Sequence, residues 1–393
     1  MARNVAIVGI GQTNYTTLRN DVTYPELVFE AVTKALSDAS MSIDEIEAVV
    51  FSLAPTSLVG VDAMERWCID AVGAKGKPFM RVNTGGATGG SAAQAGYFHI
   101  ASAFFDTVLV VGAEKQGDTP DTQLILNQIW DPRFERAVAL NAINMSSFQA
   151  VRHMHKYGTT EQQMAMVSVR DHKNALNNPH AHIRQAVSLE DVLASRVVCW
   201  PLKLLDCCPR SSGACAVIMA SEGRTRKLMQ RPAWIKGIGA TTNTYYMGDK
   251  METEMFNDHG DWDELALAAE HAYRMAGISN PAKQIDVAEI YGPFSCLEIA
   301  AVEALGFCPK GQGGKFEEQG FFNMTGELPV NPSGGALCSN PIAVTGLVRV
   351  AEAALQVTGR AEGRQVNGAK TAVATAIGGS LQFHTAMVIS ANL

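Results

Sequence analysis

Short apolar runs rich in β-branched residues alternate with longer alanine-rich segments along this chain. The runs at residues 5–8, 48–51 and 108–111 have the length and composition of β-strands. The segments at 27–39 and 90–104 are typical of helices. This alternation predicts an α/β fold. Because the strands are apolar throughout, rather than at every second position, we expect both faces of the sheet to be covered.

The pattern occurs twice, at an offset of roughly 240 residues that grows along the chain. Four pairs of segments match in the same order: residues 6–11 with 235–239, 43–50 with 285–291, 82–83 with 330–335, and 108–113 with 372–379. We therefore predict two pseudo-symmetric βαβαβ halves, residues 1–232 and 233–393. A polar stretch at 114–195, rich in Asn, Gln and His, interrupts the first half, which we expect to resume at 204–219.

Composition and charge narrow the class of protein. A chain of 393 residues exceeds one compact core, which agrees with a two-part architecture. Its net charge of −7 gives no electrostatic footprint for nucleic acid. We find no apolar run near the ~20 residues that span a bilayer, and the opening residues are typical of a β-strand, so we expect no signal peptide. Eight cysteines without regular spacing favour reduced thiols, so we expect a cytoplasmic protein that binds neither nucleic acid nor membrane.

A glycine-rich segment at 81–92 is the most informative motif. It resembles the cysteine elbow of the thiolases, in which a cysteine accepts the acyl group from a coenzyme A (CoA) thioester. In this chain Gly86 stands at the cysteine position, while Asn83, Ala87 and Thr88 keep the surrounding pattern. The resemblance implies a thiolase architecture without its covalent chemistry. A plainer alternative is that Gly86 serves only a tight strand-to-helix turn.

Further motifs extend the resemblance over essentially the whole chain, and they are closest to the sterol-carrier-protein-type, or lipid-transfer, thiolases. The matching segments are residues 157–160, 172–175, 205–209, 303–311 and 331–335. This family implies a five-layered αβαβα core, with the polar insertion forming a loop domain that covers the substrate. It also implies that the protein acts on CoA thioesters, with CoA as part of the substrate and no separate cofactor.

The resemblance places the remaining catalytic positions at residues of other types. Tyr291 opens the segment that usually begins with histidine, Asn340 replaces the histidine of the Gly-His-Pro turn, and Ala376 replaces the cysteine of the last Cys-x-Gly turn. Thiolysis needs a thiolate and a base, and neither stands at its own place. The chain is similar to the steroid side-chain-cleaving aldolases, a thiolase-derived group that lacks the cysteine and uses tyrosines. Asn340 departs from that group, where a second tyrosine is expected.

These comparisons give a set of candidate residues. Tyr291 is the candidate proton carrier, and Asn340 can donate to an enolate oxygen but cannot exchange protons. The oxyanion and substrate contacts implied by the family fall at Gly379, Ser333, Gly335 and Phe294. Simpler interpretations are a buried phenol that fills the volume of the histidine and an asparagine chosen for its turn before proline.

For several cysteines and histidines, a structural role is a simpler interpretation than a catalytic or metal-binding one. Cys296 and Cys338 lie beside the motifs and could replace the missing thiol, but small core residues are the ordinary alternative. Adjacent Cys207 and Cys208 are poorly spaced for chelation, and the histidine pairs in the insertion are not on strands. We therefore predict no metal site in this chain.

Three functions follow as hypotheses. The first is non-covalent retro-aldol cleavage of a β-hydroxyacyl-CoA, of the steroid side-chain type. The second is an atypical thiolase or acyltransferase acting on a β-ketoacyl-CoA, and the third is a non-catalytic acyl-CoA-binding scaffold. The family further implies a homodimer and a zinc-ribbon/OB-fold partner protein that would supply any metal.

Overall fold

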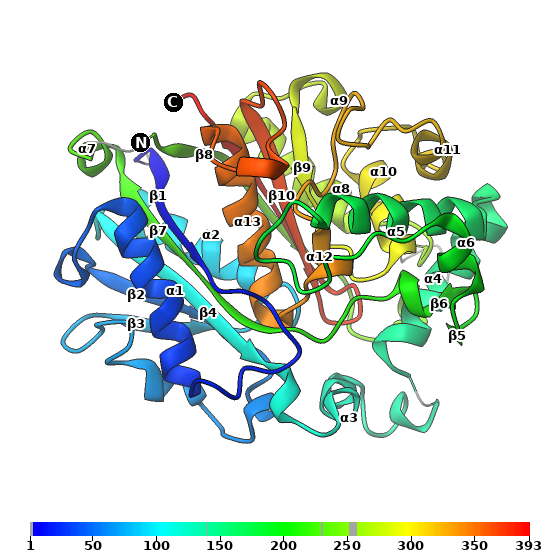
Figure 1. The fold of residues 1–393 in the computed structure, drawn as a ribbon, viewed down its shortest axis with the longest axis horizontal. Helices are drawn as coiled ribbons and strands as arrows, with labels where there is room; N and C mark the ends of the chain where they lie inside the picture. Colours follow the sequence, from blue (N-terminus) through cyan, green and yellow to red (C-terminus); the bar gives the residue numbers. More distant parts are fainter. Residues whose placement is uncertain (1–2, 139, 229–230, 251–257) are drawn as a thin grey trace.

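The computed structural model describes residues 3–138, 140–228, 231–250 and 258–393 (Figure 1). Nine strands form one mixed sheet in the order β3-β2-β4-β7-β1-β8-β11-β10-β9. These strands are β1 (Val5–Gln12), β2 (Ala48–Ser52), β3 (Phe79–Val82), β4 (Thr107–Lys115), β7 (Ser212–Ser221), β8 (Ala233–Thr242), β9 (Val287–Glu289), β10 (Thr371–Gly378) and β11 (Phe383–Ser390).

The strand order confirms the sequence repeat. Reading outward from the centre, the first half runs β1-β7-β4-β2-β3 and the second runs β8-β11-β10-β9. An isolated parallel bridge between Ala288 and Val330 supplies the counterpart of β3. Each pair of matching sequence segments thus occupies equivalent positions in the two halves. The halves join where β1 and β8 pair through Ala6 and Ile7.

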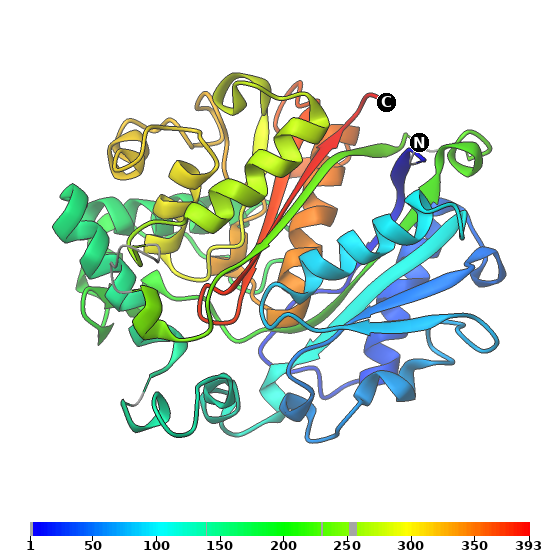
Figure 2. The ribbon, with the colours of Figure 1, turned by 180° about the vertical axis from the view of Figure 1, so that it is seen from behind.

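The strands β1-β7-β4-β2-β3 and β8-β11-β10-β9 form two half-sheets. Helices cover the outer faces of these half-sheets and fill the space between them. The longer ones are α1 (Tyr24–Ala39), α2 (Thr88–Ala101), α8 (Asp263–Ala276) and α13 (Ile342–Thr358). Helix α1 covers β1, β7 and β4, α8 covers β8 and β11, and α2 and α13 pack between the halves (Figures 1 and 2). Every residue of β1 and β4 is buried, as uniformly apolar strands predict. The expected layered α/β architecture is therefore present.

Local sequence signals set the helix boundaries. Helix α1 begins after a capping box in which the Thr23 hydroxyl and the Glu26 carboxylate satisfy each other's backbone N–H groups. It ends at Ser40, which adopts a left-handed conformation with φ 53°. Helix α13 is buried on almost all sides, because it lies between the two half-sheets.

The insertion between β4 and β7 is built mainly of helices. It contains α3 (Thr122–Leu126), α4 (Ala142–Tyr157), α5 (Glu161–Ala175), α6 (Leu189–Ala194), β5 (Val197–Cys199) and β6 (Leu202–Lys203). We expected the core to resume at residue 204, but β7 begins only at Ser212. The difference arises because Leu204–Asp206 form a short 3-10 helix after the β5-β6 hairpin, and Cys207 makes only an isolated bridge with Phe294 before β7 begins.

The second half carries the shorter helices that complete the fold. They are α9 (Pro281–Gln284), α10 (Ser295–Ala304), α11 (Gly313–Glu318) and α12 (Gly335–Cys338), and α7 (Glu222–Thr225) follows β7 in the first half. Helix α10 packs against α4 and α5, so the insertion rests on the second half of the molecule (Figure 1). No helix among the described residues is long and apolar enough to cross a membrane.

Candidate active site

A cavity of about 290 Å³ opens where the turn after β3, the loop after β9, the turn after β10 and helix α4 meet. Four residues selected from the sequence line it together: Gly86, Tyr291, Phe294 and Gly379. They come from three strand ends that are more than 80 residues apart along the chain. The rest of the lining is largely apolar and includes Trp130 of the insertion. The tertiary structure therefore brings the cysteine-elbow motif and Tyr291 into one site.

The backbone at Gly86 is packed too closely for a side chain of ordinary size. A Cβ atom built there would lie 2.7 Å from the carbonyl oxygen of Ile377 and 3.4 Å from the Tyr291 hydroxyl. The neighbouring Gly85 has φ +61°, and a Cβ on it would lie 2.9 Å from the Gly379 nitrogen. The two glycine turns are therefore in direct contact. Backbone N–H groups at glycine turns are a kind of donor that can stabilise an oxyanion.

Tyr291 is held at the base of the cavity with only 3% of its surface exposed. Its backbone N–H donates to the Thr375 hydroxyl at 3.2 Å. Burial raises the pKa of the phenol well above its usual value, and this outweighs the lowering by hydrogen bonds with Thr345 and Asn340. The phenol is therefore neutral across the physiological range. In this state it can donate a proton but is a poor base.

Asn340 lies beside Tyr291, behind the cavity surface. Its Oδ1 accepts a hydrogen bond from the Thr345 hydroxyl at 2.8 Å, and its Nδ2 donates to the Cys208 sulfur at 3.0 Å. Its backbone N–H donates to the Ser211 hydroxyl at 3.0 Å. Two hydrogen bonds orient the side-chain amide, and the second Nδ2 hydrogen remains for the Tyr291 hydroxyl. Asn340 is therefore suited to support the Tyr291 hydroxyl or an oxyanion.

Glu114, near the end of β4, is a fully buried carboxyl close to the site. Neither of its carboxyl oxygens has a hydrogen-bond partner of good geometry among the described residues. Burial raises its pKa well above the usual range, although the backbone amides of Ala54 and Ala343 lower it slightly. A charge on Glu114 would raise the pKa of Tyr291 further. The carboxyl is therefore kept in its neutral form next to the phenol.

Ser333 and Gly335 lie away from the cavity lining. The Ser333 hydroxyl donates to Glu289 at 2.7 Å and accepts from Arg349 at 2.8 Å. Gly335 has φ +60°, and a Cβ on it would lie 2.5 Å from the Asp171 carboxylate. The structure thus gives both residues a place in a buried turn, apart from the other candidates.

The geometry agrees with comparisons with known proteins. Residues 5–223 match the family model for the thiolase N-terminal domain, and residues 248–391 match the thiolase C-terminal domain-like family. An acetyl-CoA acetyltransferase of Methanothermobacter thermautotrophicus is 34% identical over 380 residues, which cover 96% of this chain and 97% of the relative. The chain belongs to the thiolase family.

Two further similarities refine its place among thiolases. Sterol carrier protein 2 of Bos taurus is 32% identical over 390 residues, covering 96% of this chain and 70% of the relative. A solved structure described as an Ltp2-ChsH2(DUF35) aldolase superposes with a TM-score of 0.83 at 27% identity, covering 98% of this chain and 97% of that one. The thiolase fold and the sterol-carrier-protein-type resemblance expected from the sequence are therefore confirmed.

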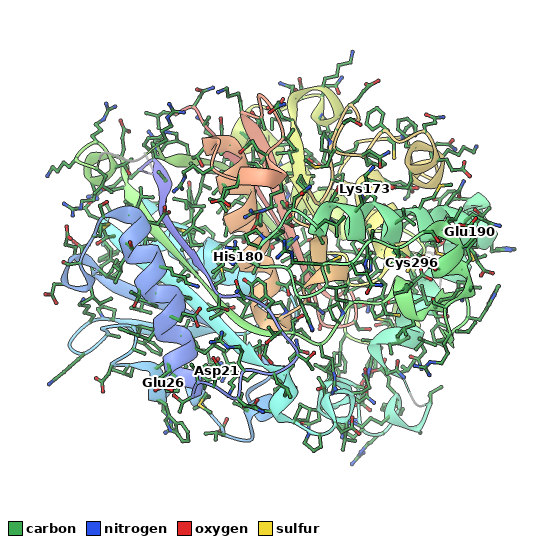
Figure 3. All side chains as sticks on the ribbon, viewed as in Figure 1. Asp21, Glu26, Lys173, His180, Glu190 and Cys296 are labelled. Carbon is green, nitrogen blue, oxygen red and sulfur yellow. The ribbon has the colours of Figure 1, made fainter. Side chains whose placement is uncertain are left out.

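This thiolase presents no thiol in its cavity. None of its eight cysteines lines the site. Cys296 lies on α10 against α4 and α5 (Figure 3), and Cys338 is fully buried. Burial raises the pKa of both thiols well above the usual range, and it raises the pKa of Cys208 to about 11. All three therefore remain protonated and weakly nucleophilic at neutral pH.

Sequence reasoning missed one wall of the cavity. Leu126, Ile129 and Trp130 line it from the segment that follows β4, where the sequence shows only a polar insertion. It also missed the contact between Cys208 and Asn340, which are 132 positions apart. No local motif marks these residues, because their role depends on which distant segment they face.

A second cavity, of about 660 Å³, shares helix α4 with the first. Ser146 lines the first cavity and Ser147 the second. Phe148, Trp200 and Arg152 also line the second cavity, and Arg152 forms an ion pair with Asp258 at 2.7 Å. Within the described part of the chain, no group of three or more His, Cys, Asp or Glu side chains is arranged to hold a metal ion.

Proposed function

We propose that this thiolase cleaves the carbon–carbon bond of a β-hydroxyacyl-CoA by a non-covalent retro-aldol reaction. The observation that carries the proposal is the pairing of Gly86 with Tyr291: a phenol hydroxyl lies 3.4 Å from the position of the missing Cβ. A proton donor thus stands where the family usually has its nucleophile. Retro-aldol cleavage needs proton transfer and enolate stabilisation, and it forms no acyl-enzyme.

The neutral phenol suits a coupled proton transfer. As the bond between the α and β carbons breaks, Tyr291 donates its proton to the α carbon, and the proton of the substrate β-hydroxyl passes to the phenol oxygen. The products are a ketone or aldehyde and a shortened acyl-CoA, and Tyr291 ends neutral as it began. Backbone N–H groups of Gly86 and Gly379 stabilise the negative charge that develops on the thioester oxygen. Burial makes a free phenolate unfavourable, so the two transfers are expected to occur together.

The same proposal also concerns the place of the CoA moiety and the partners of the protein. The larger cavity beside α4 would receive the CoA moiety, with the thioester reaching the smaller cavity past Ser146 and Met145. We also propose an accessory DUF35-type partner, because the similar structure is described as an Ltp2-ChsH2(DUF35) aldolase. A homodimer is proposed from the family resemblance alone. Zinc, where present, would belong to that partner, and the reaction itself calls for no cofactor.

One observation favours a second candidate, thiolytic cleavage of a β-ketoacyl-CoA. The Cys208 sulfur lies 3.0 Å from the Asn340 amide, beside Tyr291. A thiol at this place would need its pKa lowered from about 11 before it could attack a thioester at neutral pH. The retro-aldol proposal requires no such change and is therefore preferred.

The decisive experiment incubates the protein, alone and with its co-expressed DUF35-type partner, with β-hydroxyacyl-CoA and β-ketoacyl-CoA substrates. Products are identified by mass spectrometry with and without free CoA. Cleavage of the hydroxy substrate without free CoA is the expected result. Cleavage of the keto substrate only, with free CoA required, would support thiolysis instead, and an acyl group found on Cys208 would identify the nucleophile. Binding without turnover in every case would indicate a scaffold.

A further inference from the structure

The small cavity is bounded by both the core and the insertion. Among the described residues, no Asp, Glu, Lys, Arg or His side chain lines it. Gly86 and Tyr291 line it from the core, and Leu126, Ile129 and Trp130 line it from the insertion. A group that carries a charge would lose its hydration in this cavity without meeting a side chain of opposite charge.

Trp130 forms part of the insertion wall with a side chain that is 2% exposed. Hydrogen bonds hold its backbone on both sides. The backbone N–H of Trp130 donates to the Asn127 carbonyl at 3.2 Å, and the Arg136 guanidinium donates to the backbone carbonyl of Trp130 at 3.0 Å. The Tyr245 hydroxyl donates to the carbonyl of the preceding Ile129 at 3.1 Å. Several hydrogen bonds would have to break for this wall to move away, so the indole sets a firm limit.

The volume of the small cavity limits the size of the acyl group that it can hold. A dry engineered cavity of about 150 Å³ holds one benzene molecule. The present cavity, at about 290 Å³, is roughly twice as large, and it must also hold the thioester carbonyl and the two carbons whose bond breaks. The space left is enough for one ring or a short branched chain, and too small to enclose a nucleus of four fused rings.

We infer that the substrate carries a compact, uncharged apolar group of one ring or a comparable branched chain, and that Trp130 is the residue that sets this limit. The inference rests on the proposed function for the place of the thioester. It departs from the steroid substrate that the sequence resemblance implies. It concerns binding and does not depend on which carbon–carbon bond cleavage the site performs.

The test measures binding of unreactive CoA thioesters that lack the β-hydroxyl, by isothermal titration calorimetry. The probes are phenylacetyl-CoA, glutaryl-CoA and the CoA thioester of a four-ring carboxylic acid, with free CoA as the reference. We expect phenylacetyl-CoA to bind at least tenfold more tightly than the other two thioesters. Equal or tighter binding of the four-ring or glutaryl thioester would overturn the inference and leave the retro-aldol proposal standing. If neither CoA nor any thioester binds, both are overturned.

Variants of Trp130 test whether its side chain sets the size limit of the acyl group. In Trp130→Ala the ratio of four-ring to phenylacetyl affinity should rise at least tenfold, because the indole volume becomes available. Trp130→Leu, a smaller change, serves if the alanine variant does not fold, and should move the ratio in the same direction. Trp67→Ala is the matched control, because Trp67 is 57% exposed and does not line the cavity. An unchanged ratio in a folded Trp130 variant would contradict the assignment.

Discussion

Two turns of this thiolase occupy equivalent positions in the repeat but have different surroundings. One follows β3 and contains Asn83, Gly85 and Gly86; its counterpart follows Val330 and runs from Asn331 to Gly335. Both follow a residue paired to the sheet and lead toward a helix packed between the two halves. This helix is α2 in one case, and in the other it is α13, which follows the short α12. The first turn opens onto the cavity, whereas the second is buried.

The difference lies in what each turn faces. The buried turn is filled by a polar network in which Arg349 contacts both Glu289 and Ser333, and all three side chains have almost no exposed surface. The open turn lines the apolar cavity together with Tyr291, and its Gly85 and Gly86 pack against Gly378 and Gly379. One copy of the duplicated turn thus closes a buried polar network, while the other lines the cavity. Glycine-rich turn sequence alone does not distinguish these roles.

The largest expected effect is on catalysis at the open turn. Tyr291→Phe removes the proposed proton donor and should lower kcat for retro-aldol cleavage by about 100-fold or more, the usual cost of losing an acid–base group. The melting temperature should change little, because the ring is retained. Steady-state kinetics and a thermal melt on the same preparation check both parts. A variant with wild-type kcat would remove Tyr291 from the mechanism.

The second prediction concerns the buried turn. Arg349→Met leaves Glu289 without its ion-pair partner and should destabilise the fold by about 3 kcal/mol or more. Urea unfolding measures this loss, and kcat per folded molecule should fall far less than in Tyr291→Phe. Arg226→Met breaks an exposed pair with Glu222 and serves as the control, with an expected change below about 1 kcal/mol. Equal losses in the two variants would argue against a special role for the buried network.

A third test adds one carbon atom to the open turn. In Gly86→Ala the new Cβ would meet the Ile377 carbonyl at 2.7 Å, so backbone shifts costing about 1–3 kcal/mol are expected. The shift of this turn relative to the Tyr291 hydroxyl, which lies 3.4 Å from the new Cβ, should reduce kcat by roughly tenfold or more. The control is Gly223→Ala on α7, where a Cβ meets nothing within 4 Å. If Gly86→Ala matched this control in stability and rate, the steric argument would fail.

The smallest effect concerns the buried carboxyl behind the open turn. Because burial raises the pKa of Glu114 in the folded state, folding favours its protonated form, and stability is lost as pH rises from the unfolded pKa toward the folded one. Glu114→Gln stays neutral, so at pH 9 it should be more stable than wild type by about 1 kcal/mol, with a smaller difference at pH 5. Unfolding at both pH values measures this. Glu270→Gln, with a side chain 66% exposed, should show no such trend.

Much of the fold was accessible from the sequence, because it depends on patterns that each segment carries by itself. Uniformly apolar strands and alanine-rich helices predicted covered sheets, and four matching segment pairs predicted the two halves. The point where the core resumes was placed too early, because Leu204–Asp206 form a short 3-10 helix and Cys207 only an isolated bridge, and no sequence signal separates these residues from a core strand.

The candidate site was accessible only in part. Motifs placed Gly86, Tyr291, Phe294 and Gly379, and the structure brings these four to one cavity. Ser333 was selected by the same reasoning, but its hydroxyl is engaged by Glu289 and Arg349 within the core. A motif records which residue types surround a position, and it does not record whether the turn faces a cavity or a neighbouring helix.

The sequence by itself determined that this protein is built as a duplicated α/β thiolase and that its nucleophile position is a glycine. Only the tertiary structure decided that the Tyr291 hydroxyl lies beside that glycine, that burial keeps the phenol neutral, and that Trp130 of the insertion lines the same cavity. Local patterns follow from residues close together in the chain. Desolvation, cavity size and the pairing of distant groups depend on which surfaces come together when the halves and the insertion pack.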